Sequence, residues 1–303
     1  MHLPESPLKI RYLALSITEE LAGAEVNTLL RRVLGLSGTV LRRVKWLPDG
    51  ITIDGTRVNV RYRVAQGQTL WVRLSDPDAA NQPWPSPGHL DIVYEDEDMT
   101  IVNKAPGVLV HPSHGHFADT VGNFLMWHYL DNREAAGFHP VHRLDKGTSG
   151  LLVTAKHPHG QEKLKNQLHT GNFRRVYLAV CDGVPQPPQG VVDAPMGLRE
   201  GSLTAQMVRP DGKPARTHYQ VLKAMGERAL VELELDTGRT HQIRVHMAHL
   251  GCPLTGDFLY GKEAPELISR PALHSAHLEL THPVTGERLT FDCPLPEDMK
   301  KLL

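Results

Sequence analysis

Near the N-terminus, apolar residues recur first at the spacing of helices and then at that of strands. The pattern predicts a helix over residues 25–33, with an apolar face of Val26, Leu29, Leu30 and Val33. Ser37 can cap a second helix that runs to about Trp46. Alternating apolar residues then predict strands at 51–53, 58–64 and 69–74, the first two joined by a turn at Asp54-Gly55. This order of elements predicts a small α/β module.

Residues 75–88 contain four prolines and little periodicity, which is typical of a linker. We therefore divide the chain into a module at 1–74, a linker at 75–88 and a domain at 89–303. Strand patterns dominate this domain, at 91–94, 100–103, 150–156, 173–181, 217–223, 229–236, 273–280 and 289–291. Two helices are predicted among them, at 160–170 closed by Gly171 and at 241–250 capped by Thr240 and closed by Gly251. The expected fold class is α+β, a mixed, mainly antiparallel sheet with helices packed on it.

The composition excludes a transmembrane protein, a secreted disulfide scaffold and a largely disordered chain. The 303 residues are 40% hydrophobic and 22% charged, as in ordinary folded proteins. No apolar run approaches the ~18 residues of a membrane span, and the N-terminus lacks the stretches of a secretory signal. The three cysteines, Cys181, Cys252 and Cys293, form no CxxC pair, so reduced thiols are expected. We therefore expect a cytoplasmic protein that does not contact a membrane.

Charge is unevenly distributed along the chain. The net charge of −1 and the pI of about 7.0 do not indicate a strongly basic nucleic-acid-binding protein. Between Lys9 and Arg73, however, eleven basic and five acidic residues give +6, which leaves −7 for the rest. Such a basic module could contact phosphates, and a merely solvated basic face is the alternative.

The stretch from His139 to Val153 carries the most specific candidate chemistry. It holds Asp145 in a loop rich in Gly, Thr and Ser that runs directly into an apolar strand. Loops on rigid strands often carry catalytic groups, whereas an Asp in such a loop can also simply stabilise a turn. The residue type and its setting leave both interpretations open.

Residues 142–150, His-Arg-Leu-Asp-Lys-Gly-Thr-Ser-Gly, resemble the HRLDxxTSG motif of the RluA family of RNA pseudouridine synthases. Other family motifs follow in order over residues 89–296. They are Asn103-Lys104, Pro106-Gly107, His111-Pro112, Phe173 to Ala179, Gly212 to Ala215, Thr237 to His246, Gly256-Asp257, Leu273 to Ala276 and Thr281 to Pro283. The resemblance implies a pseudouridine synthase fold and the isomerisation of specific uridines in structured RNA, with no cofactor and no metal.

The resemblance also implies roles for individual residues. Asp145 would be the essential carboxylate, which either attacks the anomeric carbon or removes a ribose proton. Arg244 would be its cationic partner, and a cation opposes the protonation of a buried carboxylate. Tyr177 would pack on the uracil ring and take part in the late proton removal. Arg143 would fill the gap that the uridine leaves when it flips out of its stack.

Further motif residues are expected on the substrate side of the site. They are Lys104, His142, Thr148, Arg239 and His241. His241 and Arg244 are three residues apart in the predicted helix, so we expect both on one helical face.

The N-terminal module resembles, in its element order, a small RNA-binding domain named after a protein of the small ribosomal subunit. Glu25-Val26-Asn27 and Ser37-Gly38-Thr39 depart from the usual sequence of that domain. Its candidate phosphate contacts are Arg31, Arg32, Arg42, Arg43 and Lys45. A fused RNA-binding module favours large-subunit ribosomal RNA over transfer RNA as the partner, and a monomer is the default expectation.

Three other functions compete with this one. The eighteen histidines invite a zinc site, but there is no HExxH or CxxC motif. A glycoside hydrolase normally uses two carboxylates, and the core motif offers only Asp145. A non-catalytic RNA-binding protein would be expected to have altered Asp145, Tyr177 or Arg244, and all three are present.

Overall fold

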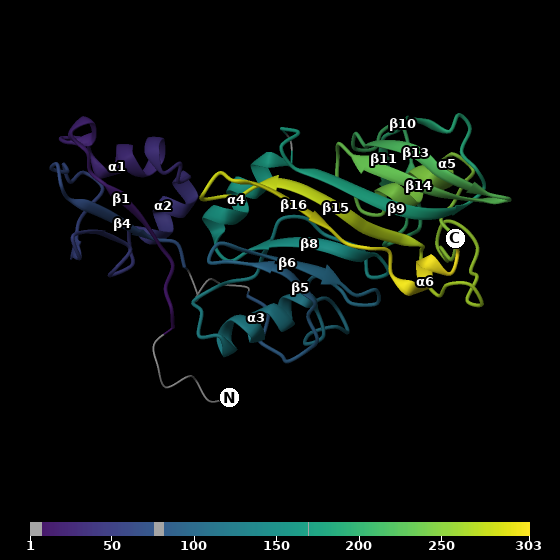
Figure 1. The fold of residues 1–303 in the computed structure, drawn as a ribbon, viewed down its shortest axis with the longest axis horizontal. Helices are drawn as coiled ribbons and strands as arrows, with labels where there is room; N and C mark the ends of the chain where they lie inside the picture. The colour runs from purple at the N-terminus through teal and green to yellow at the C-terminus, as the bar shows by residue number, and fades with distance from the viewer. Residues whose placement is uncertain (1–7, 76–81, 169) are drawn as a thin grey trace.

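The computed structural model describes residues 8–75, 82–168 and 170–303. Over these residues the chain forms a small sheet at one end and a long sheet that makes up most of the rest (Figure 1). Residues 1–7 of the predicted module and 76–81 of the predicted linker lie outside the described residues. The division at 74 and 89 therefore stays a prediction, although the two sheets bury separate hydrophobic cores.

The small sheet is antiparallel, in the order β1-β4-β2-β3. Its strands are β1 (Tyr12–Ser16), β2 (Ile51–Ile53), β3 (Thr56–Arg57) and β4 (Thr69–Arg73). The helical segments beside it are η1 (Glu19–Leu21), α1 (Val26–Thr28), η2 (Leu29–Val33) and α2 (Gly38–Val44). Ser37 caps α2 as predicted, because its hydroxyl accepts a hydrogen bond from the N–H of Val40 at 3.3 Å.

Two predictions for this module are wrong. Val33 is 48% exposed instead of buried, because η2 is a π-helical turn in which the N–H of Leu34 bonds the carbonyl of Leu29. The wider turn rotates Val33 off the apolar face. The predicted strand at 58–64 is also absent from the described residues, since β3 ends at Arg57. That segment instead offers its carbonyls to the unpaired N–H groups at the start of α1.

The long sheet has the strand order β10-β13-β14-β9-β15-β8-β6-β5, with β16 paired to β15 and β7 to β8. Its strands are β5 (Ile92–Glu95), β6 (Met99–Lys104), β7 (His139–Pro140), β8 (Ser149–Ala155), β9 (Arg174–Asp182), β10 (Gln189–Asp193), β13 (Arg216–Met225), β14 (Arg228–Leu235), β15 (Leu273–Thr281) and β16 (Arg288–Asp292). Only the β8–β15 pairing among these is parallel over the described residues. The expected mixed, mainly antiparallel α+β fold is confirmed.

Helices cover both faces of the long sheet. Their bounds are α3 (Val121–Asp131), α4 (Pro158–Gln167), α5 (Gln242–His249) and α6 (Glu297–Lys300). Residues of α3 and α5 share a core with Val102 and Leu152, whereas α4 packs on Ile101 and Leu151, their neighbours on the opposite face. The sequence pattern did not predict α3, although Thr120 and Asn123 form a capping box at its start. Among the described helices, none is long and apolar enough to cross a membrane.

The start of α5 differs from the prediction. The residue before the helix is His241, in a left-handed conformation at φ 58°, and Thr240 does not cap it. The side chain of Gln242 holds the bend, because its Oε1 accepts hydrogen bonds from the N–H of Arg239 and the hydroxyl of Thr237. A left-handed histidine stores about 1–3 kcal/mol of strain, which is typical of functional sites. His241 and Arg244 therefore do not share a helical face.

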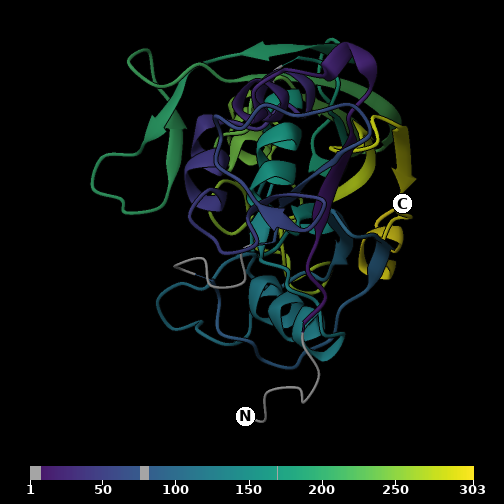
Figure 2. The same ribbon diagram turned by 90° about the vertical axis from the view of Figure 1, so that its left-hand side faces the viewer.

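Two short strands form a separate hairpin beside the long sheet. They are β11 (Met196–Leu198) and β12 (Gln206–Val208). Figure 2 shows this green hairpin standing out from the body of the molecule. It meets α5 along β12, so it borders the start of that helix.

The segment before β1 fastens the small sheet to the long one. Lys9 exchanges backbone hydrogen bonds with Arg133 and Ala135, at 2.7 and 2.9 Å. The guanidinium of Arg11 binds both carboxylate oxygens of Asp98, at 2.9 and 3.0 Å, and Asp98 is buried. The two sheets are thus joined by main-chain pairing and by a bidentate ion pair.

Candidate active site around Asp145 and Arg244

Asp145 lies in the loop that leads into β8, and its side chain is 27% exposed. Its carbonyl accepts a hydrogen bond from the N–H of Thr148 at 3.1 Å, which closes the loop as a turn. Two residues later, Gly150 has φ +104° and pairs with Ser275 of β15. A Cβ at this position would lie 2.2 Å from the carbonyl oxygen of Ser275, so only glycine permits this approach.

Two buried basic side chains each donate to a carbonyl of this loop, and one of them also binds the segment that follows β6. The Nζ of Lys104 donates to the carbonyls of Ala105, Val108 and Lys146, at 2.8, 2.8 and 3.3 Å. The guanidinium of Arg270 donates to the carbonyl of Gly147 at 2.9 Å. Burial lowers the pKa of Lys104 to about 7. Lys104 was expected on the substrate side, but the residue is only 2% exposed and its ammonium binds backbone carbonyls.

Arg244, in α5, lies between two carboxylates. Its Nε and Nη2 donate to Asp257 at 2.7 and 2.8 Å, and its Nη1 lies 3.6 Å from Oδ2 of Asp145. Burial alone would lower the pKa of Arg244, but the hydrogen bonds and charge of Asp257, with the charge of Asp145, raise it above its usual value. Asp257 is fully buried and also accepts the N–H groups of Leu259 and Tyr260. The guanidinium is therefore fixed on one side and presented to Asp145 on the other.

Tyr177 and His241 lie close to the same pair. Tyr177 is buried in β9 opposite Ser275; burial raises the pKa of its phenol against the effect of Arg175, and the charge of Asp145 adds to the rise. His241 accepts a hydrogen bond at Nδ1 from the hydroxyl of Tyr260, at 2.8 Å. Burial lowers the pKa of His241, which favours the neutral ring that can accept this bond.

Tyr260 was not singled out from the sequence, although it lies close to the Gly256-Asp257 motif. Its ring packs under the guanidinium of Arg244, with 5.0 Å between the ring centroid and Cζ. Its hydroxyl accepts the N–H of Gln206 in β12 at 2.8 Å. Tyr260 therefore connects the projecting hairpin to both His241 and Arg244.

Two of the expected substrate contacts are instead packed behind the Asp145 loop. Thr148 is 2% exposed and His142 is 8% exposed. The Nε2 of His142 accepts a hydrogen bond from the N–H of Val153 at 3.3 Å, and burial lowers the pKa of this imidazole to about 3. Their positions suit support of the loop and do not suit contact with a bound nucleotide.

A basic cleft of about 570 Å³ runs beside the site. Its cationic lining consists of Arg143, Arg209, Lys213 and Arg239, with Asp211 as its acidic member. Arg143 reaches the hydroxyl of Thr240 at 3.3 Å, and the adjacent His241 belongs to the site itself. Arg209 and Lys213 were not assigned a role from the sequence, although Gly212 to Ala215 is a motif of the resembled family. The β11–β12 hairpin supplies the opposite wall of the cleft.

The five candidate phosphate contacts of the N-terminal module are all exposed. Arg31 and Arg32 lie on η2, Arg42 and Arg43 on α2, and Lys45 follows α2 over the ring of Trp46. Figure 1 places these helices at the opposite end of the molecule from α5. The structure therefore does not bring these cations to Asp145.

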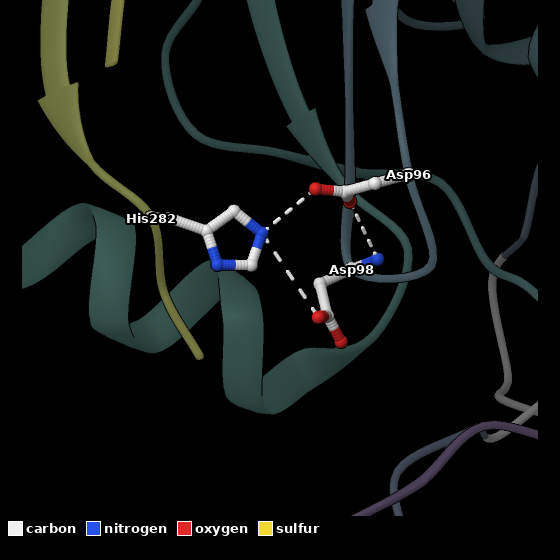
Figure 3. Close-up of side chains that lie close together, drawn as sticks. All are labelled: Asp96, Asp98 and His282. Carbon is white, nitrogen blue, oxygen red and sulfur yellow. Dashed lines mark hydrogen bonds and ion pairs between the residues drawn. The ribbon is translucent and has the colours of Figure 1, made fainter. Parts of the chain in front are cut away.

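One group of potential metal ligands lies elsewhere, at the β5–β6 turn. Figure 3 shows His282 facing Asp96 and Asp98. The Nε2 of His282 donates to Asp96 at 2.8 Å, and that of His157 donates to Asp98 at 2.9 Å. Arg11 fills the remaining side of Asp98. These oxygens already have protein donors, so the group acts as a hydrogen-bond network between strands.

Comparisons with known proteins agree with this fold. Residues 98–249 match the family model described as RNA pseudouridylate synthase. The chain is 41% identical over 270 residues to an uncharacterised RNA pseudouridine synthase of Bacillus subtilis, covering 89% of this chain and 95% of that protein. It is 40% identical over 279 residues to the ribosomal large subunit pseudouridine synthase D of Pseudomonas aeruginosa, covering 86% of each.

A solved structure of an RNA pseudouridylate synthase domain protein has a similar fold. Human RNA pseudouridylate synthase domain containing 4 superposes with a TM-score of 0.57 at 27% identity, covering 70% of this chain and 90% of that one. The matched residues 98–249 include the Asp145 loop, Tyr177 and Arg244. On these grounds the chain belongs to the RluA-type family of RNA pseudouridine synthases.

Proposed function

We propose that Asp145 is the carboxylate that converts uridine to pseudouridine, with Arg244 as its cationic partner. The observation that carries this proposal is the 3.6 Å approach of Arg244 Nη1 to Asp145, while Asp257 binds the other side of the same guanidinium. The arginine side chain is 5% exposed and that of Asp145 is 27% exposed. A charged oxygen that is held on one side and open on the other suits attack on an incoming ribose.

The reaction breaks the bond between the ribose and a nitrogen of the uracil. It then joins the same uracil to the same ribose through a ring carbon. Asp145 acts at the sugar, either on the anomeric carbon or on a ribose proton, while the base turns. Tyr177 lies under the site as the surface against which the uracil ring packs. The uridine must first leave its stack, which costs roughly a few kcal/mol. Arg143, exposed at the mouth of the cleft, fills the gap with its planar guanidinium.

We infer that the substrate is large-subunit ribosomal RNA. Support comes from the ribosomal large subunit pseudouridine synthases among the relatives, which align over most of both chains. The basic cleft offers Arg143, Lys213 and Arg239 to the backbone next to the target, while Asp211 binds the fourth cation, Arg209. The N-terminal module offers five more at the far end, in keeping with an RNA-binding role for that module.

The test is a pseudouridine map by carbodiimide chemistry in cells that carry either the intact chain or Asp145→Asn. We expect one or a few sites in large-subunit ribosomal RNA to disappear in the variant. Loss of sites in transfer RNA alone would overturn the proposal that ribosomal RNA is the substrate, but would support the catalytic role of Asp145. Comparable maps for both chains would overturn the role of Asp145.

A purified-enzyme assay on total RNA supplies the matched control. Asp193 also pairs with an arginine, Arg216, but its side chain is 57% exposed and lies outside the site. Asp193→Asn removes the same charge and is expected to retain activity. Asp145→Asn should lower the rate by several decades, each worth ~1.4 kcal/mol of barrier.

A further inference from the structure

We propose that Phe258 is a stacking platform for the unpaired RNA base next to the target uridine. This inference rests on the proposed function, because it takes Asp145 as the place where the target ribose binds. Phe258 lies between α5 and β15 and is 61% exposed. Its ring centroid is 5.7 Å from Cζ of Arg244, the residue whose Nη1 approaches Asp145.

The backbone that carries Phe258 is rigid. The preceding residue, Asp257, is fully buried and binds Arg244 through both oxygens. The next two residues, Leu259 and Tyr260, donate their N–H groups to the same carboxylate. The backbone at Phe258 is therefore fixed, and much of the ring surface is in solvent. Single exposed apolar residues are common, so exposure alone does not indicate a function. What indicates a function is the position of this ring next to Arg244.

Three features of that place point to a nucleic-acid base. The protein is an RNA pseudouridine synthase, so an RNA strand must pass beside Asp145. The cleft that reaches the site through Thr240 is lined by Arg143, Lys213 and Arg239, which suit a phosphate backbone. Proteins bind single-stranded nucleic acid by combining a basic groove with exposed aromatic rings, and Phe258 is such a ring beside Arg244.

The geometry also assigns which base the ring receives. Arg244 touches both Asp145 and Phe258, so the ring lies one side chain away from the carboxylate. The target uracil occupies the position at Asp145 and Tyr177. When it flips out, Arg143 fills the gap against one neighbour in the strand, and Phe258 stacks on the other neighbour.

The experiment compares Phe258→Ala, Phe258→Leu and Phe258→Trp. Equilibrium binding of a labelled ribosomal RNA fragment is measured in the Asp145→Asn background, and kcat/KM is measured with Asp145 present. We expect Ala and Leu to raise Kd and lower kcat/KM by roughly 5- to 150-fold, from the ~1–3 kcal/mol of one base–aromatic stack. Trp should restore both, because it keeps a π-face that Leu lacks.

A second arm identifies the base. RNA with an abasic site beside the target should bind the Phe258 protein as weakly as intact RNA binds Phe258→Ala, and the two changes together should add no further loss. Trp127→Ala, at another exposed aromatic on α3, should bind as the parent does.

Equal affinities for Ala, Leu and Trp at the parent level would overturn the stacking role. A fall in kcat/KM with unchanged Kd would also overturn it and assign Phe258 to the support of Arg244. Because Kd is measured without turnover, failure of this inference is separable from failure of the role proposed for Asp145.

Discussion

At the scale of single residues, the position of Arg244 depends on Asp257. Asp257→Asn keeps the shape of the side chain but removes the charge that binds the guanidinium through two oxygens. Arg244 then loses its anchor and its hold on Asp145. We expect kcat/KM to fall roughly 10- to 1,000-fold, or about 1.4–4 kcal/mol of barrier. Single-turnover rates measure this, with Asp193→Asn as the exposed control, and parent-like rates would contradict it.

The same residues show how far sequence reasoning reaches at this scale. The motifs single out Asp145 and Arg244 although 99 positions separate them, and the structure brings them within 3.6 Å. Motif membership does not separate residues that face a substrate from those that support them. His142 and Thr148 belong to the same motif as Asp145 but are buried behind it. Tyr260 was missed because its role depends on interactions with three residues in two other segments, β12 and the start of α5.

At the scale of elements, the C-terminal helix α6 supports the Asp145 loop. Asp298 of α6 binds Arg270 at 2.7 and 2.9 Å, and Arg270 donates to the carbonyl of Gly147. Asp298→Asn should loosen that loop, lowering kcat several-fold and the free energy of unfolding by about 1–2 kcal/mol. Urea unfolding and steady-state rates check this. Glu297→Gln is the control, because Glu297 pairs with Lys300 on the surface of the same helix and is 79% exposed; equal losses in both variants would contradict the role of α6.

Elements were predictable where local pattern decides them. The strand patterns predicted the strands of the long sheet except β7 and β10, and Ser37 predicted the cap of α2. The segment 58–64 alternates like a strand, yet its carbonyls accept hydrogen bonds from the first N–H groups of α1. These partners lie more than thirty residues away, so no local pattern could predict them. The π turn at Leu29–Val33 could not be predicted either, because the apolar spacing of 26–33 fits an ordinary helix and does not show that the turn is wider and rotates Val33 outward.

At the scale of the whole molecule, Asp98 joins the small sheet to the long one. Burial would raise the pKa of Asp98, but the hydrogen bonds from His157 and Arg11 hold it well below its usual value. Because the folded pKa lies below the unfolded one, the stabilisation is fully present above pH ~4 and is lost as the pH falls below it. Asp98→Asn should cost about 2–4 kcal/mol at pH 7, and the gap to the parent should shrink on acidification. Urea unfolding at pH 7, 5, 4 and 3 measures this; a gap independent of pH would contradict it.

The distance between the basic module and Asp145 makes a separate prediction about RNA. Arg31 and Arg32 lie at the far end of the molecule from α5, so they can hold a remote part of the strand without touching the reacting uridine. Replacing both with Gln should weaken RNA binding and flatten its dependence on salt, by about 0.7–0.9 in log–log slope for each phosphate that the protein no longer neutralises. Turnover at saturating RNA should change little, since Asp145 and Arg244 keep their geometry. Measuring Kd from 50 to 300 mM salt tests this, with the double variant Lys300→Gln/Lys301→Gln as a control that removes the same charge. An unchanged slope would show that the module does not bind RNA. A loss of turnover would show that the module shapes the active site.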